Sequence, residues 1–182
     1  MKISYNHIAI EGNIGSGKTT LAKFLSSHFK GDLLLEEFTE NKFLTSYYAN
    51  GDYALQTEIQ FLIDRSRQIK EFLKNAHSLI ISDYYPSKSL IFSKMNLLKE
   101  EFEITQQLHN TLFKNFNSPE ILIFIDSEID EVYKNIKTRN RSNEEKIDLP
   151  YLKKISRNYE SWLSNLNIPV LKINGKSIDY SS

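Results

Sequence analysis

Eight consecutive residues near the N-terminus have the composition and spacing of a phosphate-binding loop. The run Gly12-Asn13-Ile14-Gly15-Ser16-Gly17-Lys18-Thr19 fits the pattern of a glycine, four residues, and then Gly-Lys-Ser/Thr. Glycines let the backbone curl around a phosphate, the lysine reaches the β- and γ-phosphates, and the threonine hydroxyl ligates Mg²⁺. The run therefore predicts a site for a nucleoside triphosphate, without indicating which reaction follows.

Three acidic residues follow apolar runs that are typical of strands. Glu36 and Glu37 follow the second run, and Asp83 follows the third. In a parallel sheet the carboxyl ends of the strands meet beside the phosphate loop, so these carboxylates can accept a hydroxyl proton or hold Mg²⁺ through water. The alternative for each residue is a helix cap or a solvated strand end.

Arginines supply a second set of candidates. Arg139 and Arg141, followed by Glu144, suit a lid over a triphosphate, because guanidinium groups pair with phosphate better than lysine does. On charge alone, a solvated helix end is favoured. Arg65 lies seven residues after Glu58 in a long helical pattern, so the two share a face and point either into a cleft or to solvent.

The elements that position these residues alternate between strands and helices. Five short apolar runs predict strands, at Ile8–Ile10, Leu33–Leu35, Leu79–Ser82, Ile121–Ile125 and Val170–Ile173. Apolar periodicity predicts the intervening helices, at Thr20–Phe29, Tyr53–Leu73, about Glu101–Phe116 and Glu128–Thr138, with a further helix beginning near Tyr151 after Pro150. Asp126 and Ser127 are expected to cap the fourth of these helices. Such alternation predicts an α/β fold whose parallel sheet is covered on both faces, in a single domain over residues 1–182.

Composition excludes several classes of protein. Lys plus Arg and Asp plus Glu both number 23, and the formal net charge of zero argues against a nucleic-acid partner. The chain has no cysteine, which excludes disulfides and thiol catalysis. No apolar run approaches the roughly 20 residues of a membrane helix, and Met1–His7 leads into a strand without a signal-peptide core. We therefore expect a cytoplasmic protein with no membrane partner.

Together these motifs resemble the deoxyribonucleoside kinase family, more closely its bacterial deoxyadenosine/deoxyguanosine kinase branch. The resemblance runs from about Ile8 to Trp162 and more weakly to the end, and it includes the loop at Glu11–Leu21, the helix segment Phe61–Arg65 and the Arg-x-Arg-x-x-Glu lid at 139–144. It implies a P-loop kinase with a five-stranded parallel sheet and an arginine-containing lid. It also implies ATP and Mg²⁺, a deoxynucleoside acceptor, and a homodimer packed through the long helices.

On the acceptor side, the resemblance assigns roles to residues from three segments. Glu36 takes the position of the base on the 5′-hydroxyl, with Glu37 as a possible register slip, and Arg65 lies near the 5′-oxygen. Asp83 corresponds to a ligand of Mg²⁺ through water, beside Thr19.

The sugar and the phosphates are assigned in the same way. Tyr47, in preference to Tyr48, and Glu144 correspond to contacts with the 3′-hydroxyl, and Phe61 belongs to the substrate-binding helix. Lys18, Arg139 and Arg141 correspond to groups that stabilise the transferred phosphoryl. The phosphate-binding segment extends over Gly12, Asn13, Ile14, Gly15, Ser16, Gly17, Lys18, Thr19 and Thr20.

Three departures from the family pattern concern the phosphate and the base. Tyr84 stands where many members have arginine, and Ser87-Lys88 stands near an Asp-Arg or Asp-Lys pair of some members. The base-reading glutamine falls on Glu58, while Gln56 lies two residues away and points roughly 200° from it, so that only one of them can face the base. An ionised carboxylate accepts the two adjacent N–H groups of guanine, whereas glutamine donates and accepts, as adenine requires.

The resemblance thus predicts transfer of phosphate from ATP to the 5′-hydroxyl of a deoxynucleoside, with a purine expected as the base, in nucleotide salvage. One alternative is a thymidylate-type nucleoside monophosphate kinase, which Glu36 disfavours because it would repel the acceptor's phosphate. The other is a P-loop regulatory ATP-binding module with no acceptor. The chain lacks the Asn-Lys-x-Asp motif of guanine-binding switches.

Overall fold

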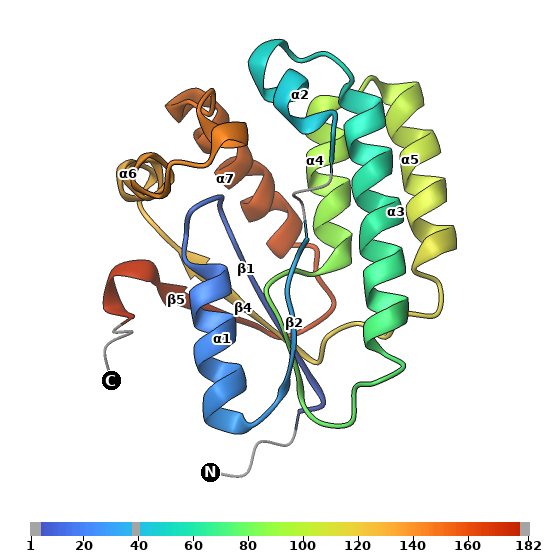
Figure 1. The fold of residues 1–182 in the computed structure, drawn as a ribbon, viewed down its shortest axis with the longest axis vertical. Helices are drawn as coiled ribbons and strands as arrows, with labels where there is room; N and C mark the ends of the chain where they lie inside the picture. Colours follow the sequence, from blue (N-terminus) through green and yellow to red (C-terminus); the bar gives the residue numbers. More distant parts are fainter. Residues whose placement is uncertain (1–4, 38–40, 179–182) are drawn as a thin grey trace.

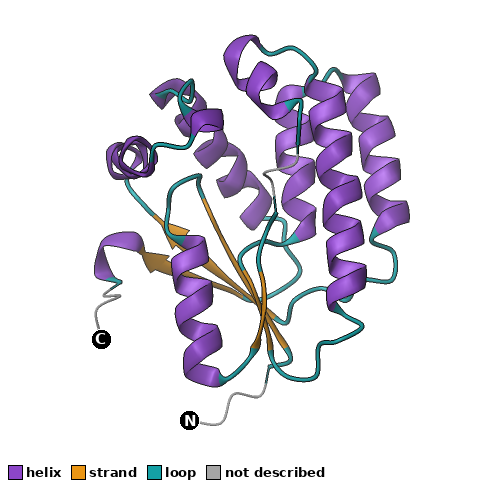
Figure 2. Ribbon diagram, viewed as in Figure 1, coloured by secondary structure: helices purple, strands orange, loops and turns teal. Residues whose placement is uncertain are grey.

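A five-stranded, all-parallel sheet forms the centre of the molecule (Figure 2), with the strand order β2-β3-β1-β4-β5. The computed structural model describes residues 5–37 and 41–178. The strands are β1 (His7–Gly12), β2 (Asp32–Leu34), β3 (Ile80–Ser82), β4 (Ile121–Asp126) and β5 (Val170–Asn174). All five predicted strands are confirmed within two residues of their expected bounds. The first four residues of the predicted N-terminal segment, Met1–Ser4, lie outside the described part.

Alternate residues of β1 pack into different cores on the two faces of the sheet, as the period of a strand requires. Ile8 and Ile10 pack with Leu21 and Ala22, which lie on α1 (Lys18–Phe29). Ala9, between them, belongs to the cluster on the opposite face, which includes Leu122 and Phe124 of β4. The central strand is therefore buried on both faces, and its last residue leads directly into the phosphate loop.

The remaining helices form a layer beside and above the sheet, with α3, α4 and α5 side by side in Figure 1. They are α2 (Leu44–Asn50), α3 (Ala54–Phe72), α4 (Ser89–Asn96), α5 (Lys99–Leu112), α6 (Ile129–Arg139) and α7 (Leu149–Leu163). Helix α4 is central in this layer, since it contacts α3, α5 and α7. Within the described ranges, no helix is long and apolar enough to cross a bilayer.

Two helix boundaries differ from those expected. Helix α6 begins after Glu128, and no side chain caps it, so the predicted capping by Asp126 and Ser127 is wrong. Asp126 is the last residue of β4, where it pairs with Asn174, and it lies two residues before the N-cap position Glu128. Helix α7 begins as predicted beside Pro150, with Asp148 as its cap through a 2.8 Å bond from the Tyr151 N–H to Oδ1.

Helix α4 is the element that periodicity did not predict. It is eight residues long, and the described structure separates it from α5 by Leu97 and Leu98 only. Because isolated helices of this length are marginal, its formation depends on packing against α3, α5 and α7. Helix α5 itself begins two residues earlier and ends four residues earlier than the expected range of about 101–116.

Candidate active site

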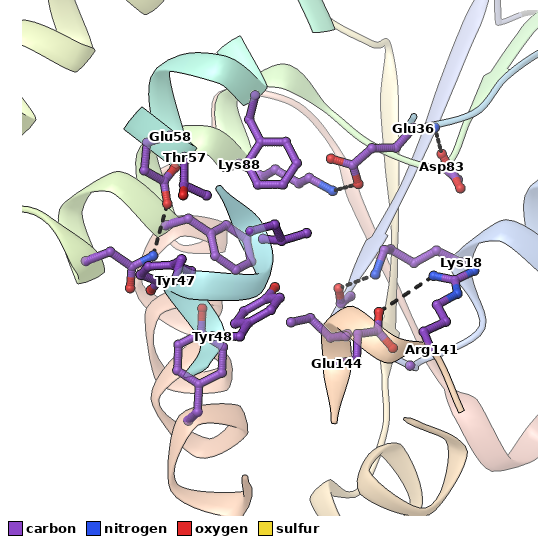
Figure 3. A pocket seen from close by; sticks show the side chains of 18 of the residues that line it. Lys18, Glu36, Tyr47, Tyr48, Thr57, Glu58, Asp83, Lys88, Arg141 and Glu144 are labelled. Atoms are coloured by element: carbon purple, nitrogen blue, oxygen red, sulfur yellow. Dashed lines mark hydrogen bonds and ion pairs between the residues drawn. The ribbon is translucent and has the colours of Figure 1, made fainter. Parts of the chain in front are cut away.

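A single groove gathers most of the residues that the sequence singles out. It extends from the phosphate loop to α2, α3 and α4, and Figure 3 shows its two ends. Predicted residues that line it are Gly12, Ile14, Gly15, Lys18, Thr19, Glu36, Tyr47, Glu58, Phe61, Arg65, Asp83, Arg139, Arg141 and Glu144. Asn13, Ser16, Gly17 and Thr20 belong to the same loop but do not line the groove.

The phosphate loop is shaped by its glycines and anchored from behind. Gly15 and Gly17 have φ values of 83° and 94°, a region that glycine adopts without steric cost. Asn13 points away from the groove and donates to the Leu152 carbonyl (3.0 Å) and to Ser156 Oγ (2.8 Å) on α7. Its role is therefore to fix the loop against α7, with the N-terminus of α1 facing the groove.

Lys18 begins α1 and folds back over the loop. Its Nζ donates to the carbonyls of Gly12 and Asn13, both at 2.9 Å. Burial, and secondarily the neighbouring ammonium of Lys88, lower the pKa of Lys18 to about 8. An anionic phosphate beside this ammonium would favour its charged form.

Thr19 and Asp83 bring two oxygen ligands together beside the loop. Thr19 Oγ1 donates to Asp83 Oδ2 at 2.5 Å, and the Glu36 N–H donates to the other carboxylate oxygen at 2.7 Å. Burial raises the pKa of Asp83. Hydroxyl and carboxylate oxygens suit Mg²⁺, which protein sites commonly hold with one or two side chains together with substrate phosphates. Among the described residues, no cluster of three or more His, Cys, Asp or Glu side chains could hold a metal by itself.

Glu36 lies between two cations from different elements. Arg65 on α3 donates to Oε1 through Nε (2.8 Å) and Nη2, and Lys88 donates to Oε2 through Nζ (2.5 Å; Figure 3). Burial by itself would raise the pKa of Glu36, but Arg65 and Lys88 hold it well below its usual range. Glu36 is therefore an ionised carboxylate. One of its oxygens receives two N–H groups and the other receives one.

Arg65 is itself held in place from the opposite side. Its Nη1 donates to Ser89 Oγ at 2.7 Å, and its guanidinium lies 4.7 Å from the centre of the Phe61 ring. Glu58 and Arg65 are both buried and both line the groove, so their shared face points into a cleft and not to solvent.

Lys88 contacts Glu36 in the groove, a role that the sequence did not indicate. It ends a short 3-10 helix, η1 (Pro86–Lys88), directly before α4, and only 4% of it is exposed. Tyr84 is buried in the core and donates to Gln68 Oε1, while the Lys88 ammonium lies 5.7 Å from its ring. The signal available in the sequence was the isolated lysine close to the apolar run of α4, where a buried position demands an acidic partner.

The charged residues of the predicted lid pair with one another. Arg139 donates to both oxygens of Glu144 at 2.7 and 2.6 Å, and an Arg141 nitrogen lies 3.6 Å from Oε1. Asn140 makes this approach possible, because its left-handed backbone (φ 48°) turns the chain at the end of α6. All three charged side chains line the groove together with residues of the phosphate loop.

The far end of the groove is aromatic and includes the buried acid Glu58. Tyr47 and Tyr48 on α2 both line it, with ring centres 5.4 Å apart. Glu58 on α3 accepts from Asn96 Nδ2 at 3.0 Å and from Ser93 Oγ at 3.1 Å, both on α4. Gln56 is exposed and lies outside the groove, so Glu58 and not Gln56 faces it. Burial raises the pKa of Glu58 to about 7.

Comparisons with known proteins agree with this geometry. The family described as deoxynucleoside kinase matches residues 8–182. A deoxyguanosine kinase of Bacillus subtilis is 32% identical over 95% of this chain and 88% of its own, and a deoxyadenosine kinase of Dictyostelium discoideum is 32% identical over 92% and 71%. A solved deoxyadenosine kinase from M. mycoides with bound dCTP superposes with a TM-score of 0.83 at 25% identity, covering 95% of this chain and 92% of that one.

Proposed function

The chain belongs to the deoxynucleoside kinase family, and on that premise we propose that it transfers the γ-phosphoryl group of ATP to the 5′-hydroxyl of a purine deoxynucleoside. The observation that carries the proposal is the placement of Glu36. Its carboxylate lies in the same groove as the phosphate loop, next to Arg65 and Lys88. A base in that position can take the proton of a hydroxyl that attacks a phosphate bound at the loop.

The hydrogen bonds of Glu36 indicate which of its oxygens accepts the proton. Two N–H groups of Arg65 occupy Oε1, while Lys88 occupies one acceptor position of Oε2. A carboxylate oxygen offers about two acceptor positions, so Oε2 retains one for the 5′-hydroxyl. During transfer the 5′-oxygen bonds to the γ-phosphorus, the bond to the β-phosphate oxygen breaks, and the hydroxyl proton passes to Glu36 Oε2.

At the phosphate end of the groove, the transfer depends on positively charged side chains. Lys18, Arg139 and Arg141 line the groove around the phosphate loop and would stabilise the charge on the transferred phosphoryl. Thr19 and Asp83 would hold Mg²⁺, which when bound neutralises charge on the β- and γ-phosphates.

The sugar and base complete the proposed complex. Tyr47 and Glu144 would contact the 3′-hydroxyl, and Phe61 would pack beside the acceptor while it supports Arg65. Glu58, at the aromatic end, would read the base. In its ionised form it accepts two hydrogen bonds, which favours guanine.

We also propose a homodimer packed through the long helices. Ile63 on α3 and Ile104 on α5 are 46% and 59% exposed, and α3 and α5 contact each other. Light scattering after size-exclusion chromatography tests this, since a monomeric mass at micromolar concentration would contradict it.

Phosphoryl transfer from Mg-ATP to a panel of nucleosides and nucleotides tests the function. The panel comprises deoxyadenosine, deoxyguanosine, deoxycytidine, thymidine and their monophosphates. We expect the two purine deoxynucleosides to be the best acceptors. Transfer only to a monophosphate would favour a thymidylate-type kinase, and ATP binding without any transfer would favour a regulatory module.

A further inference from the structure

Glu58 is a buried carboxyl group at the aromatic end of the groove, and its two oxygens have different hydrogen-bond partners. The Asn96 amide donates to Oε1 and the Ser93 hydroxyl donates to Oε2. Each oxygen therefore keeps about one acceptor position that can face a ligand. A proton added at either remaining position turns that oxygen into a donor, while the other oxygen stays an acceptor.

The two protonation states present different hydrogen-bonding patterns to a base. The ionised carboxylate presents two acceptors, which match the adjacent N1–H and N2–H donors of guanine. The protonated carboxyl presents one donor and one acceptor, which match the N1 acceptor and the N6–H donor of adenine. Each state mismatches the other purine by at least one unsatisfied or repulsive contact, and such a buried mismatch discriminates strongly.

We propose that Glu58 selects between guanine and adenine by losing or gaining a proton, so that the purine preference of this kinase changes with pH. The inference rests on the proposed function, because it requires that purine deoxynucleosides bind in the groove with the base near Glu58. It makes Ser93 and Asn96 positioning residues for the base-reading carboxyl.

The surroundings of Glu58 place its titration in the neutral range. Burial raises its pKa to about 7, opposed by the Asn96 amide, the charge of Arg65 two turns along α3, and the Ser93 hydroxyl. The two α4 side chains that donate hydrogen bonds to Glu58, Ser93 and Asn96, are both neutral. At this pKa, both protonation states are populated within one pH unit of neutrality.

The other titratable groups near Glu58 are phenols. Tyr47 and Tyr48 of α2 and Tyr151 of α7 interact with it electrostatically. Burial raises the pKa of Tyr47 to about 12 and raises the pKa values of Tyr48 and Tyr151 as well. These phenols remain neutral wherever Glu58 titrates, so a pH-dependent preference between about pH 6 and pH 8 would report Glu58 itself.

The test is the ratio of kcat/KM for deoxyguanosine to kcat/KM for deoxyadenosine, at saturating Mg-ATP. Groups used equally by both substrates, including Glu36 and Lys18, cancel from this ratio. We expect the ratio to rise by tenfold or more between about pH 6 and pH 8, because the ratio of ionised to protonated carboxyl changes about tenfold per pH unit. A ratio that stays constant with pH, or use of only one purine at every pH, overturns the proposal.

Variants make the test specific. Glu58→Gln fixes one donor and one acceptor, so its ratio should favour deoxyadenosine and be independent of pH. Gln56→Glu places a carboxyl on the same helix at an exposed position outside the groove and should keep the wild-type dependence. A pH-dependent ratio that survives in Glu58→Gln overturns the inference.

Two further results separate the inference from its premise. Ser93→Ala removes a hydrogen bond that lowers the pKa of Glu58, so the protonated form should persist to higher pH and deoxyadenosine should be used better at about pH 7 than by the wild type. Failure of the wild-type enzyme to phosphorylate either purine would overturn the proposed function itself. Phosphorylation of both purines in a constant ratio would overturn only the role of Glu58.

Discussion

Two carboxylates in the same groove, the partly buried Glu36 and the buried Glu58, have opposite properties. Glu36, beside the phosphate loop, accepts hydrogen bonds from the charged groups of Arg65 and Lys88. These two cations hold its pKa below the usual range. Glu58, at the aromatic end, has only neutral donors on its oxygens, and burial raises its pKa to about 7. Burial acts on both groups in the same direction, so the difference comes from the cations.

The contrast matches the chemistry proposed for each end. A base that accepts a proton only during transfer must start ionised, and two buried cations ensure this for Glu36. A residue that reads a neutral base by hydrogen bonds needs no compensating cation. It can remain near the balance between its two protonation states.

The strongest way to break the comparison is to remove the charge of Glu36. Glu36→Gln should lower kcat by about a thousandfold, within the usual range for loss of general-base catalysis, because a neutral amide cannot accept the hydroxyl proton. The measurement is steady-state kinetics with the best purine acceptor. The neighbouring and exposed Glu37 provides the matched control, and if Glu37→Gln proves equally damaging, Glu36 is not the base.

The other carboxylate should affect stability in a pH-dependent way. The folded pKa of Glu58, about 7, lies above its ordinary value of 4.5, so the folded state binds more protons between these values and stability falls as pH rises through this range. Glu58→Gln removes this penalty. It should make the protein about 3 kcal/mol more stable than the wild type above pH 7, with the difference disappearing below about pH 4.5.

Urea denaturation of both proteins at about pH 5 and pH 8 measures this difference. A stability difference that is the same at both pH values would show that Glu58 does not titrate between them.

Removing one of the two cations should make the surroundings of Glu36 more like those of Glu58, whose hydrogen-bond partners are neutral. Lys88→Met leaves Glu36 with Arg65 alone and should lower kcat about thirtyfold, since a buried charge loses a hydrogen-bonded partner. Lys88→Arg should recover part of the loss by restoring the charge. Lys94→Met, at an exposed position on α4, is the control and should leave kcat unchanged. A full loss of activity in Lys88→Arg would argue for packing and against charge.

A smaller effect is expected from the residue that supports Arg65. Ser89→Ala removes the acceptor of the Arg65 Nη1 hydrogen bond, which costs about 1 kcal/mol and should lower kcat severalfold. The effect should be absent when Ser89→Ala is introduced into Glu36→Gln, because the serine acts through the arginine and the carboxylate. Additive losses in this double-mutant cycle would contradict that coupling.

Much of this protein could be predicted from contiguous residues. The phosphate loop, the five strands and the lid motif are local patterns, in which a few neighbouring residues fix the backbone shape or the buried face. The motif at Arg139, Arg141 and Glu144 is likewise local, and the structure joins these side chains by ion pairs within a few residues of chain. For these elements the physical determinant lies within a few residues of chain.

Only the tertiary structure decided how distant segments combine. It placed Lys88 on Glu36, 52 residues apart in the sequence, because the packing of α4 between α3 and α7 carries that lysine into the groove. It also decided that Glu58 and not Gln56 faces the groove, because the helices packed against α3 define its buried face. The same packing brought Ser93 and Asn96 of α4 to the Glu58 carboxyl. The charge state of each carboxylate follows from these long-range contacts, which the residue type alone does not contain.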